Sequence, residues 1–286
     1  SRMTNPTVAV LEQRIAALEG GVGAICTASG MSALFVTFMT LCSAGDHIVS
    51  ASQSYGSTET LLKHTLKRFN IDCTFISINN EKALKEAIQD NTKLVFCESI
   101  GNPGLEVSDL PKISKIAHQN KLPLVIDATF STPALCKPFD HGADVVVHSV
   151  TKWIGGHGVA VGGVIVDGGS FDWGSSKKHP TLTTPYEPFH GINFWEEFGP
   201  SALSMKIRAE SMRDFGPAMS PHSAFLLLQG IETLTLRMNQ HVKNAVKLSK
   251  WLLEQSPVMW VNHPDLPENP THEVAKTLFP NGAGSM

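Results

Sequence analysis

The chain has 286 residues, of which 42% are apolar and only 17% are charged, enough to build a large buried core. Its 23 Lys and Arg residues against 26 Asp and Glu residues give a net charge of −3. Because there is also no basic run, the composition argues against nucleic acid and anionic membranes as partners. The low charged fraction leaves less polar surface than usual, which favours an oligomer.

Five cysteines stand singly inside apolar stretches: Cys26, Cys42, Cys73, Cys97 and Cys136. An odd number without a CxxC pair predicts buried, reduced thiols rather than a disulfide framework. The sequence shows neither a signal-peptide pattern nor an apolar stretch long enough to span a bilayer. We therefore expect a soluble cytoplasmic protein.

Helix-type and strand-type segments alternate up to residue 169. Helix patterns cover residues 5–21, 30–42, 57–69, 81–89 and 110–120, and strand patterns cover 24–30, 47–52, 73–78, 93–99, 122–129, 144–150 and 161–169. Strands such as "LVIDA" and "DVVVH" are continuously apolar, which is typical of strands covered on both faces. The alternation predicts an α/β fold with a mostly parallel sheet flanked by helices.

The alternation of helix and strand patterns ends near residue 169. Residues 168–221 are rich in Gly, Pro and aromatic residues and predict a long ordered excursion near a site. A long helical stretch follows, and then a strand-like segment, "VMWVN" (258–262). We expect residues 1–220 to form a major domain with a truncated N-terminal arm. Residues 221–286 would then form a connecting helix and the truncated start of a smaller C-terminal α+β domain.

Ligands of open α/β sheets bind at the carboxyl ends of the strands, and two features fall there. "TASGMSA" (27–33) runs through Gly30 into a helix whose N-terminus could bind phosphate, although many such turns carry a glycine only for conformation. Asp127 ends the strand "LVIDA" and either caps a turn or pairs with a cationic ring nitrogen or a metal. Since no His/Asp/Glu cluster has ligand spacing nearby, the ring nitrogen is favoured.

The segment "HSVTKWIGGHG" (148–158) places one lysine, Lys152, among small hydroxylated residues and glycines. In an extended segment, Ser149 and Thr151 share one face, so both hydroxyls could bind one anion. Lys152 could be a simple phosphate ligand, but the GxxxxGK[ST] pattern of nucleotide-binding loops is missing. A buried lysine beside a phosphate cradle and a ring-nitrogen carboxylate fits pyridoxal 5′-phosphate (PLP).

Two other turns carry candidate residues whose individual signals are weaker. Tyr55 in "SQSYGST" could stack on a planar cofactor or be an ordinary aromatic of the core or surface. Asn102 in "ESIGNPGLEV" is, taken alone, a turn former.

Together, "SRMTNPT", "SGMSA", "YGST", "ESIGNP", "VIDATFSTP" and "HSVTKWIGGHG" resemble the cysteine/methionine-metabolism family of PLP-dependent enzymes, the trans-sulfuration enzymes. The resemblance implies a fold-type I, aminotransferase-like architecture, PLP as cofactor and no metal. It implies that Lys152 forms the Schiff base with PLP and that Asp127 pairs with the pyridinium nitrogen.

The resemblance also implies roles for the remaining candidates. Tyr55 would stack on the ring and assist proton transfer, and Asn102 would contact the ring hydroxyl. The phosphate would be held by Ser149, Thr151 and the backbone of Gly30 and Met31. Arg2 would reach the phosphate of a neighbouring subunit, which implies a dimer with shared active sites or a tetramer.

Within the family, the long excursion and its "PFHG" turn look most like the O-acetylhomoserine sulfhydrylases. This implies conversion of O-acetylhomoserine and sulfide to homocysteine and acetate, a step of methionine biosynthesis. A cystathionine γ-synthase or a methionine γ-lyase would keep the same residues and differ in product. The arginine that binds the substrate carboxylate in this family is expected beyond Met286. A third interpretation is therefore a fragment that binds PLP but does not turn over substrate. A nucleotide-binding protein, with Lys152 contacting only phosphate, is a fourth.

Overall fold

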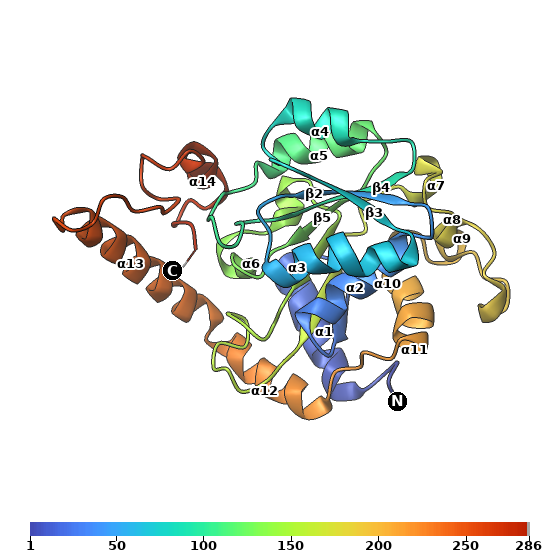
Figure 1. Ribbon diagram of the computed structural model, residues 1–286. Coiled ribbons are helices and arrows are strands. Elements are labelled where there is room, and N and C mark those ends of the chain that lie inside the picture. Colours follow the sequence, from blue (N-terminus) through green and yellow to red (C-terminus); the bar gives the residue numbers. More distant parts are fainter. Residues whose placement is uncertain (285–286) are drawn as a thin grey trace.

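A central β-sheet organises the protein (Figure 1). The computed structural model describes residues 1–284, and within them seven strands lie in the order β1-β7-β6-β5-β4-β2-β3. β7 is antiparallel to both of its neighbours, and the other paired strands are parallel. The expected mostly parallel sheet is confirmed. The strands are β1 (Gly23–Thr27), β2 (His47–Ala51), β3 (Asp72–Ile76), β4 (Thr92–Glu98), β5 (Leu124–Asp127), β6 (Val145–His148) and β7 (Gly163–Asp167).

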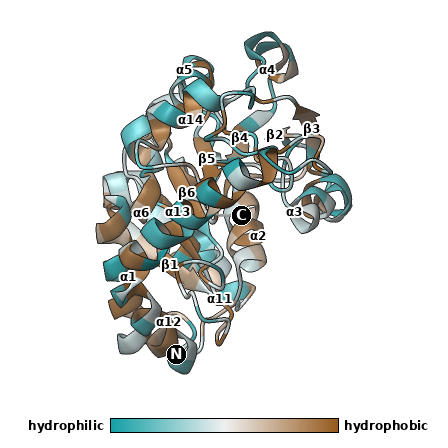
Figure 2. Cartoon of the chain, turned by 90° about the vertical axis from the view of Figure 1, so that its left-hand side faces the viewer, coloured by the Kyte–Doolittle hydropathy of each residue, from teal (hydrophilic) through white to brown (hydrophobic). Residues whose placement is uncertain are grey.

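Helices cover both faces of the sheet, which explains why its strands are apolar on both sides. Along β4, Val95 and Cys97 face one apolar layer, whereas Leu94 and Phe96 face the other. Figure 2 shows the brown apolar strands between helices whose outward faces are teal. The first layer includes side chains of α1 (Pro6–Glu19), α4 (Glu81–Ala87), α5 (Leu110–Gln119), α6 (Thr132–Leu135), α12 (Pro221–Glu232), α13 (Leu234–Leu253) and α14 (His272–Leu278). The second includes those of α2 (Gly30–Leu41) and of the helical segment that begins with α3 (Gly56–Thr60).

The ends of the first helix follow from its sequence. The Asn5 side chain accepts hydrogen bonds from the backbone N–H groups of Thr7 and Val8, at 3.0 and 3.3 Å. Gly20 adopts a φ of +86° at the other end, a left-handed conformation that glycine takes without strain. The helix expected over residues 5–21 is therefore confirmed, with Asn5 and Gly20 at its two ends.

Residues 168–221 pack against the α2 layer as a series of short helices. Their buried side chains include Trp173, Leu182 and Phe194. The α-helices are α7 (Trp173–Ser176), α8 (Pro180–Thr183), α9 (Phe194–Phe198), α10 (Ala202–Lys206) and α11 (Met212–Asp214). The expected excursion is thus ordered and contributes to the core.

The strand expected at 258–262 is wrong. These residues form no strand within residues 1–284, and Met259 and Trp260 are 95% and 75% exposed. A strand requires a neighbour for its backbone hydrogen bonds, and the apolar pattern alone could not show that none of the described segments pairs with this one.

Most of the cysteine side chains are buried, as the sequence predicts. All five cysteines are free, four of them buried and Cys73 partly exposed. Burial and the nearby charge of Asp72 raise the pKa of Cys73 to about 12, so the thiol stays protonated at neutral pH. Among residues 1–284, every helix is too short or too polar to cross a membrane.

Candidate active site

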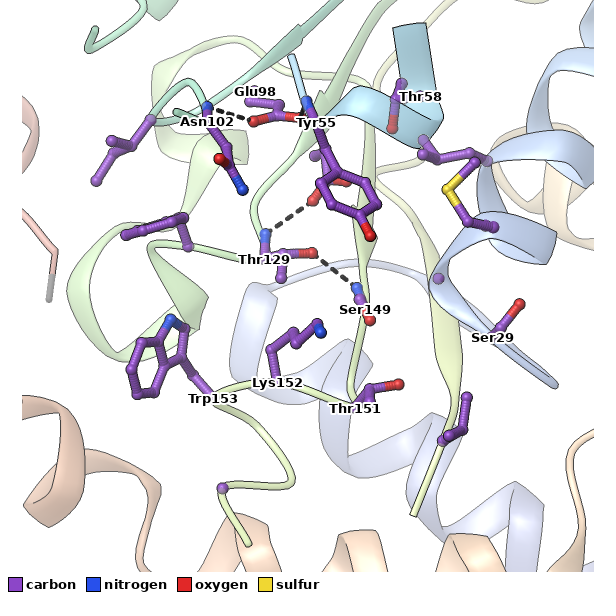
Figure 3. Close-up of a pocket in the computed structure, with 18 of the residues that line it drawn as sticks. Ser29, Tyr55, Thr58, Glu98, Asn102, Thr129, Ser149, Thr151, Lys152 and Trp153 are labelled. Carbon is purple, nitrogen blue, oxygen red and sulfur yellow. Dashed lines mark hydrogen bonds between the residues drawn. The ribbon is translucent and has the colours of Figure 1, made fainter. Parts of the chain in front are cut away.

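One cavity of about 600 Å³ opens where β2, β4, β5 and β6 end and α2 begins (Figure 3). This is the edge of the sheet at which α/β proteins bind their ligands. The cavity brings together eight of the nine residues expected from the sequence: Gly30, Met31, Tyr55, Asn102, Asp127, Ser149, Thr151 and Lys152. Its lining lies between Ser29 and Val161. The excursion expected near the site approaches it at Pro217, whose carbonyl accepts the Ala28 N–H at 2.7 Å.

Arg2 is the ninth expected residue and lies outside this cavity. It is exposed, and its Nε donates a hydrogen bond of 2.8 Å to the carbonyl of Arg213. Within the described chain, Arg2 therefore lines a different surface from the other eight.

The start of α2 lies at one end of the cavity, and helix N-termini of this kind suit an anion. The Ser29 hydroxyl accepts the Ser32 N–H at 3.1 Å, and the Ser29 carbonyl accepts the Ala33 N–H at 3.0 Å. The N–H groups of Gly30 and Met31, which no earlier turn of the helix can bond, remain to face a ligand. A Cβ on Gly30 would lie 2.5 Å from the Ser149 Cβ, so glycine is needed for the helix start to approach Ser149.

Ser149 and Thr151 line the cavity for a different reason from the one expected. β6 ends at His148, and the chain then turns, with the Lys152 N–H donating to the Ser149 carbonyl at 3.1 Å. The extended segment expected here is therefore wrong. The Thr151 hydroxyl donates to the Gly162 carbonyl at 3.1 Å and accepts its N–H at 3.0 Å. The turn, rather than a strand face, positions both hydroxyls.

Lys152 projects from this turn toward Ser149, while Trp153 points the other way (Figure 3). Lys152 is exposed in the chain, so the expected burial of this lysine is wrong. The reason is that the turn lies on the open side of the cavity, where within this chain solvent reaches the amine.

Arg237 of α13 holds the turn that carries Lys152. Its Nη1 donates to the Trp153 carbonyl at 2.7 Å, and its Nη2 donates to the carbonyls of Gly230 and Ile154 at 2.7 and 3.3 Å. Its Nε donates to the Thr233 hydroxyl at 3.0 Å. A side chain remote in sequence thus holds the backbone next to Lys152.

Two carboxyl groups lie side by side at the end of the sheet. β4 ends at Glu98 and β5 at Asp127, and the two residues are direct partners in the register. Burial raises the pKa of Asp127, whose Oδ1 accepts the Thr129 N–H at 2.9 Å. Burial and the charge of Asp127 raise the pKa of Glu98 to about 8. Two like charges at this separation disfavour one another, so the pair tends to retain a proton.

Tyr55 and Asn102 approach the cavity from the ends of β2 and β4. Tyr55 is 46% exposed as a residue. Its ring projects across the cavity toward Thr129 and Ser149, and the Asn102 amide points inward (Figure 3). Thr129 connects the segment after β5 to the segment after β6, because its hydroxyl accepts the Ser149 N–H at 2.7 Å.

Sequence reasoning missed Glu98 and Thr129, although both belong to the motifs "ESIGNP" and "VIDATFSTP". The carboxyl group four residues before Asn102 and the hydroxyl two residues after Asp127 were the available signals.

A family model described as "Cys/Met metabolism PLP-dependent enzyme" matches residues 1–286. The chain belongs to this family. It is 48% identical over 288 residues to the homocysteine synthase of Schizosaccharomyces pombe, covering 100% of the chain and 67% of the relative. The chain spans about two thirds of the length of the curated relatives it matches.

Two solved structures of the family have the same fold. The O-acetylhomoserine sulfhydrylase of Wolinella succinogenes matches with a TM-score of 0.87 at 39% identity, over 97% of this chain and 77% of that one. A Campylobacter jejuni protein assigned as an O-acetylhomoserine (thiol)-lyase matches with a TM-score of 0.96 at 37% identity, over 100% of this chain and 71% of that one. The latter structure contains N′-pyridoxyl-lysine-5′-monophosphate. The expected family, fold class and cofactor are thus confirmed.

The cavity fits the family's cofactor. The α2 start and the Ser149 hydroxyl offer donors for a phosphate, a carboxyl at Asp127 can face a cationic nitrogen, and Lys152 supplies a primary amine. All of these groups line one cavity, and glycine at position 30 lets the start of α2 lie against Ser149.

Proposed function

We propose that the protein is a PLP-dependent O-acetylhomoserine sulfhydrylase, which converts O-acetylhomoserine and sulfide to homocysteine and acetate. The observation that carries the proposal is the convergence of Lys152, Asp127 and the α2 start on one cavity. Full-chain similarity to a homocysteine synthase and to an O-acetylhomoserine sulfhydrylase supports the choice of reaction.

Bound PLP supplies an electron sink that makes the substrate's Cα and Cβ protons acidic. The protein's residues position that sink and move the protons. The Asp127 carboxylate, ionised opposite a ring N–H, keeps this proton on the nitrogen. Tyr55 would cover the ring face and Asn102 would face the ring hydroxyl. Ser149 and the N–H groups of the α2 start would hold the phosphate, together with Thr151 once its hydroxyl turns away from the Gly162 carbonyl.

Lys152 is the proposed base, and Tyr55 assists it. The lysine amine takes the Cα proton of the substrate and later returns it, which requires an amine that can swing between cofactor and substrate. Its position on an accessible turn suits that movement. Over the whole reaction the Cγ–O bond breaks, acetate leaves with the electron pair, and the sulfur of hydrosulfide forms the new bond to Cγ.

A product analysis tests the proposal. Purified protein with PLP, O-acetylhomoserine and sulfide is expected to form homocysteine, whereas Lys152→Ala is expected to lose both turnover and the visible absorbance of lysine-bound cofactor. Formation of 2-oxobutyrate without sulfide-dependent homocysteine would indicate a γ-lyase instead. Cofactor absorbance without any product would contradict the proposed activity of this chain.

The proposal extends to the assembly, the domains and the location. Arg2, exposed near the start of the chain, would reach the phosphate in a neighbouring subunit of a dimer or tetramer in the cytoplasm. Residues 1–220 would form the cofactor-binding domain, and residues from Pro221 onward would begin the next. Loss of cofactor affinity in Arg2→Ala, with unchanged oligomer size by light scattering, would support the shared site; unchanged affinity would contradict it.

A further inference from the structure

Glu98 connects two parts of the site that lie far apart in sequence. Its Oε1 accepts the backbone N–H of Tyr55 at 2.6 Å, and its Oε2 accepts the backbone N–H of Asn102 at 2.9 Å. Tyr55 follows β2 and Asn102 follows β4, which are neighbouring strands. One carboxylate thus ties together the two turns that carry the ring-facing side chains.

Glu98 is held through both its side chain and its backbone. It is only 6% exposed, and its own carbonyl accepts the Ser108 hydroxyl at 2.7 Å. Its register partner Asp127 is the carboxylate assigned to the ring nitrogen. Glu98 therefore lies against three of the groups that contact the cofactor ring, although its contacts to Tyr55 and Asn102 are through their backbone.

A carboxyl group, whether ionised or protonated, can make both of these bonds, but an amide cannot. Each oxygen accepts one N–H, whereas an amide of the same shape offers one acceptor and a donor that would face a second donor. A buried N–H left without an acceptor is costly. The need to accept two N–H groups explains why position 98 carries a carboxyl group next to Asp127, despite the repulsion between the two.

We propose that Glu98 is a positioning residue for the cofactor ring, whose two oxygens hold the Tyr55 and Asn102 turns at a fixed separation around Asp127. The inference rests on the proposed cofactor site, but not on the choice of substrate or product. It assigns to Glu98 no contact with reacting atoms.

Replacement by glutamine tests this role, since Glu98→Gln keeps the size and removes one acceptor. We expect PLP affinity, measured by fluorescence titration, to fall about tenfold. The visible circular dichroism of bound PLP should decrease, because the ring is less rigidly oriented. Glu106→Gln is the matched control: Glu106 lies in the loop that follows Glu98 and carries Asn102, accepts a bond from the Asn79 amide and lies outside the cavity lining. Wild-type affinity and dichroism in Glu98→Gln would overturn the proposal.

Amide hydrogen exchange gives a second readout that needs neither activity nor the variant. In the cofactor-free wild-type protein, the N–H groups of Tyr55 and Asn102 should both be protected, because Glu98 binds them without the cofactor. Exchange of either amide at the rate of an unprotected one would overturn the proposal even if Glu98→Gln failed to fold. A lack of homocysteine formation would refute the proposed reaction and leave these readouts unaffected.

Discussion

Replacement of Arg237 by lysine should loosen the turn that carries Lys152. The guanidinium makes two hydrogen bonds of 2.7 Å, to the carbonyls of Trp153 and Gly230, and two longer ones. A lysine has its donors on one nitrogen and cannot reproduce this fork. Hydrogen bonds from a charged donor contribute about 1.5–3 kcal/mol each. Because Arg237 is only half-buried, its bonds are partly exposed to solvent. We therefore expect Arg237→Lys to lower the free energy of unfolding by about 2 kcal/mol, which is near the lower end of the range for a single such bond.

Urea unfolding of the cofactor-free protein measures this loss. The matched control is Lys243→Ala, an exposed position on the same helix, which should change the free energy of unfolding by less than about 0.5 kcal/mol. Hydrogen exchange should also show faster opening of residues 153–156 in Arg237→Lys alone. Equal stability of the wild type and Arg237→Lys would refute the claim that this fork holds the turn.

Three other predictions concern the cavity. Gly30→Ala should weaken PLP binding at least about tenfold in a fluorescence titration, because its Cβ would collide with Ser149; near-wild-type affinity would contradict the proposed phosphate cradle. Thr129→Val should lower the free energy of unfolding in urea by about 1–2 kcal/mol, because the Ser149 N–H loses its acceptor; an unchanged value would mean that another group replaces it. The third prediction concerns pH: the folded-state pKa of Glu98, about 8, lies above its ordinary value of 4.5, so the folded protein binds this proton more tightly. Stability should therefore fall as pH rises from 4.5 to 8, and more steeply in the wild type than in Glu98→Gln by up to about 1.4 kcal/mol per pH unit. Parallel curves from urea unfolding at several pH values would contradict the raised pKa.

The sequence predicts the sheet and most of the cavity because both depend on local patterns. Continuous apolar runs indicate buried strands, and polar residues directly after them mark the ligand-binding edge. Asp127 and Lys152 could therefore be named before their distance in space was known. Tyr55 and Asn102 needed the family resemblance, since each alone has an ordinary structural explanation.

The parts that the sequence does not predict depend on contacts between remote segments. Glu98 binds backbone N–H groups, and Arg237 binds carbonyls of a distant turn. Because nearly every residue has these backbone groups, the residue types do not reveal the partners. The exposure of Lys152 depends on which surface closes the cavity. The strand expected at 258–262 required a pairing partner, and apolar periodicity does not reveal one.

The antiparallel strand β7 also sets the order in which the site can form during synthesis. Gly30 follows β1, Ser149 follows β6, and β7 lies between these two strands in the sheet. Gly30 and Ser149, which would hold the phosphate, therefore meet only after residues 163–167 have left the ribosome and paired between β1 and β6. Binding of the cofactor by a nascent chain would then show that β7 has paired with β1 and β6. Folding would have to start without PLP.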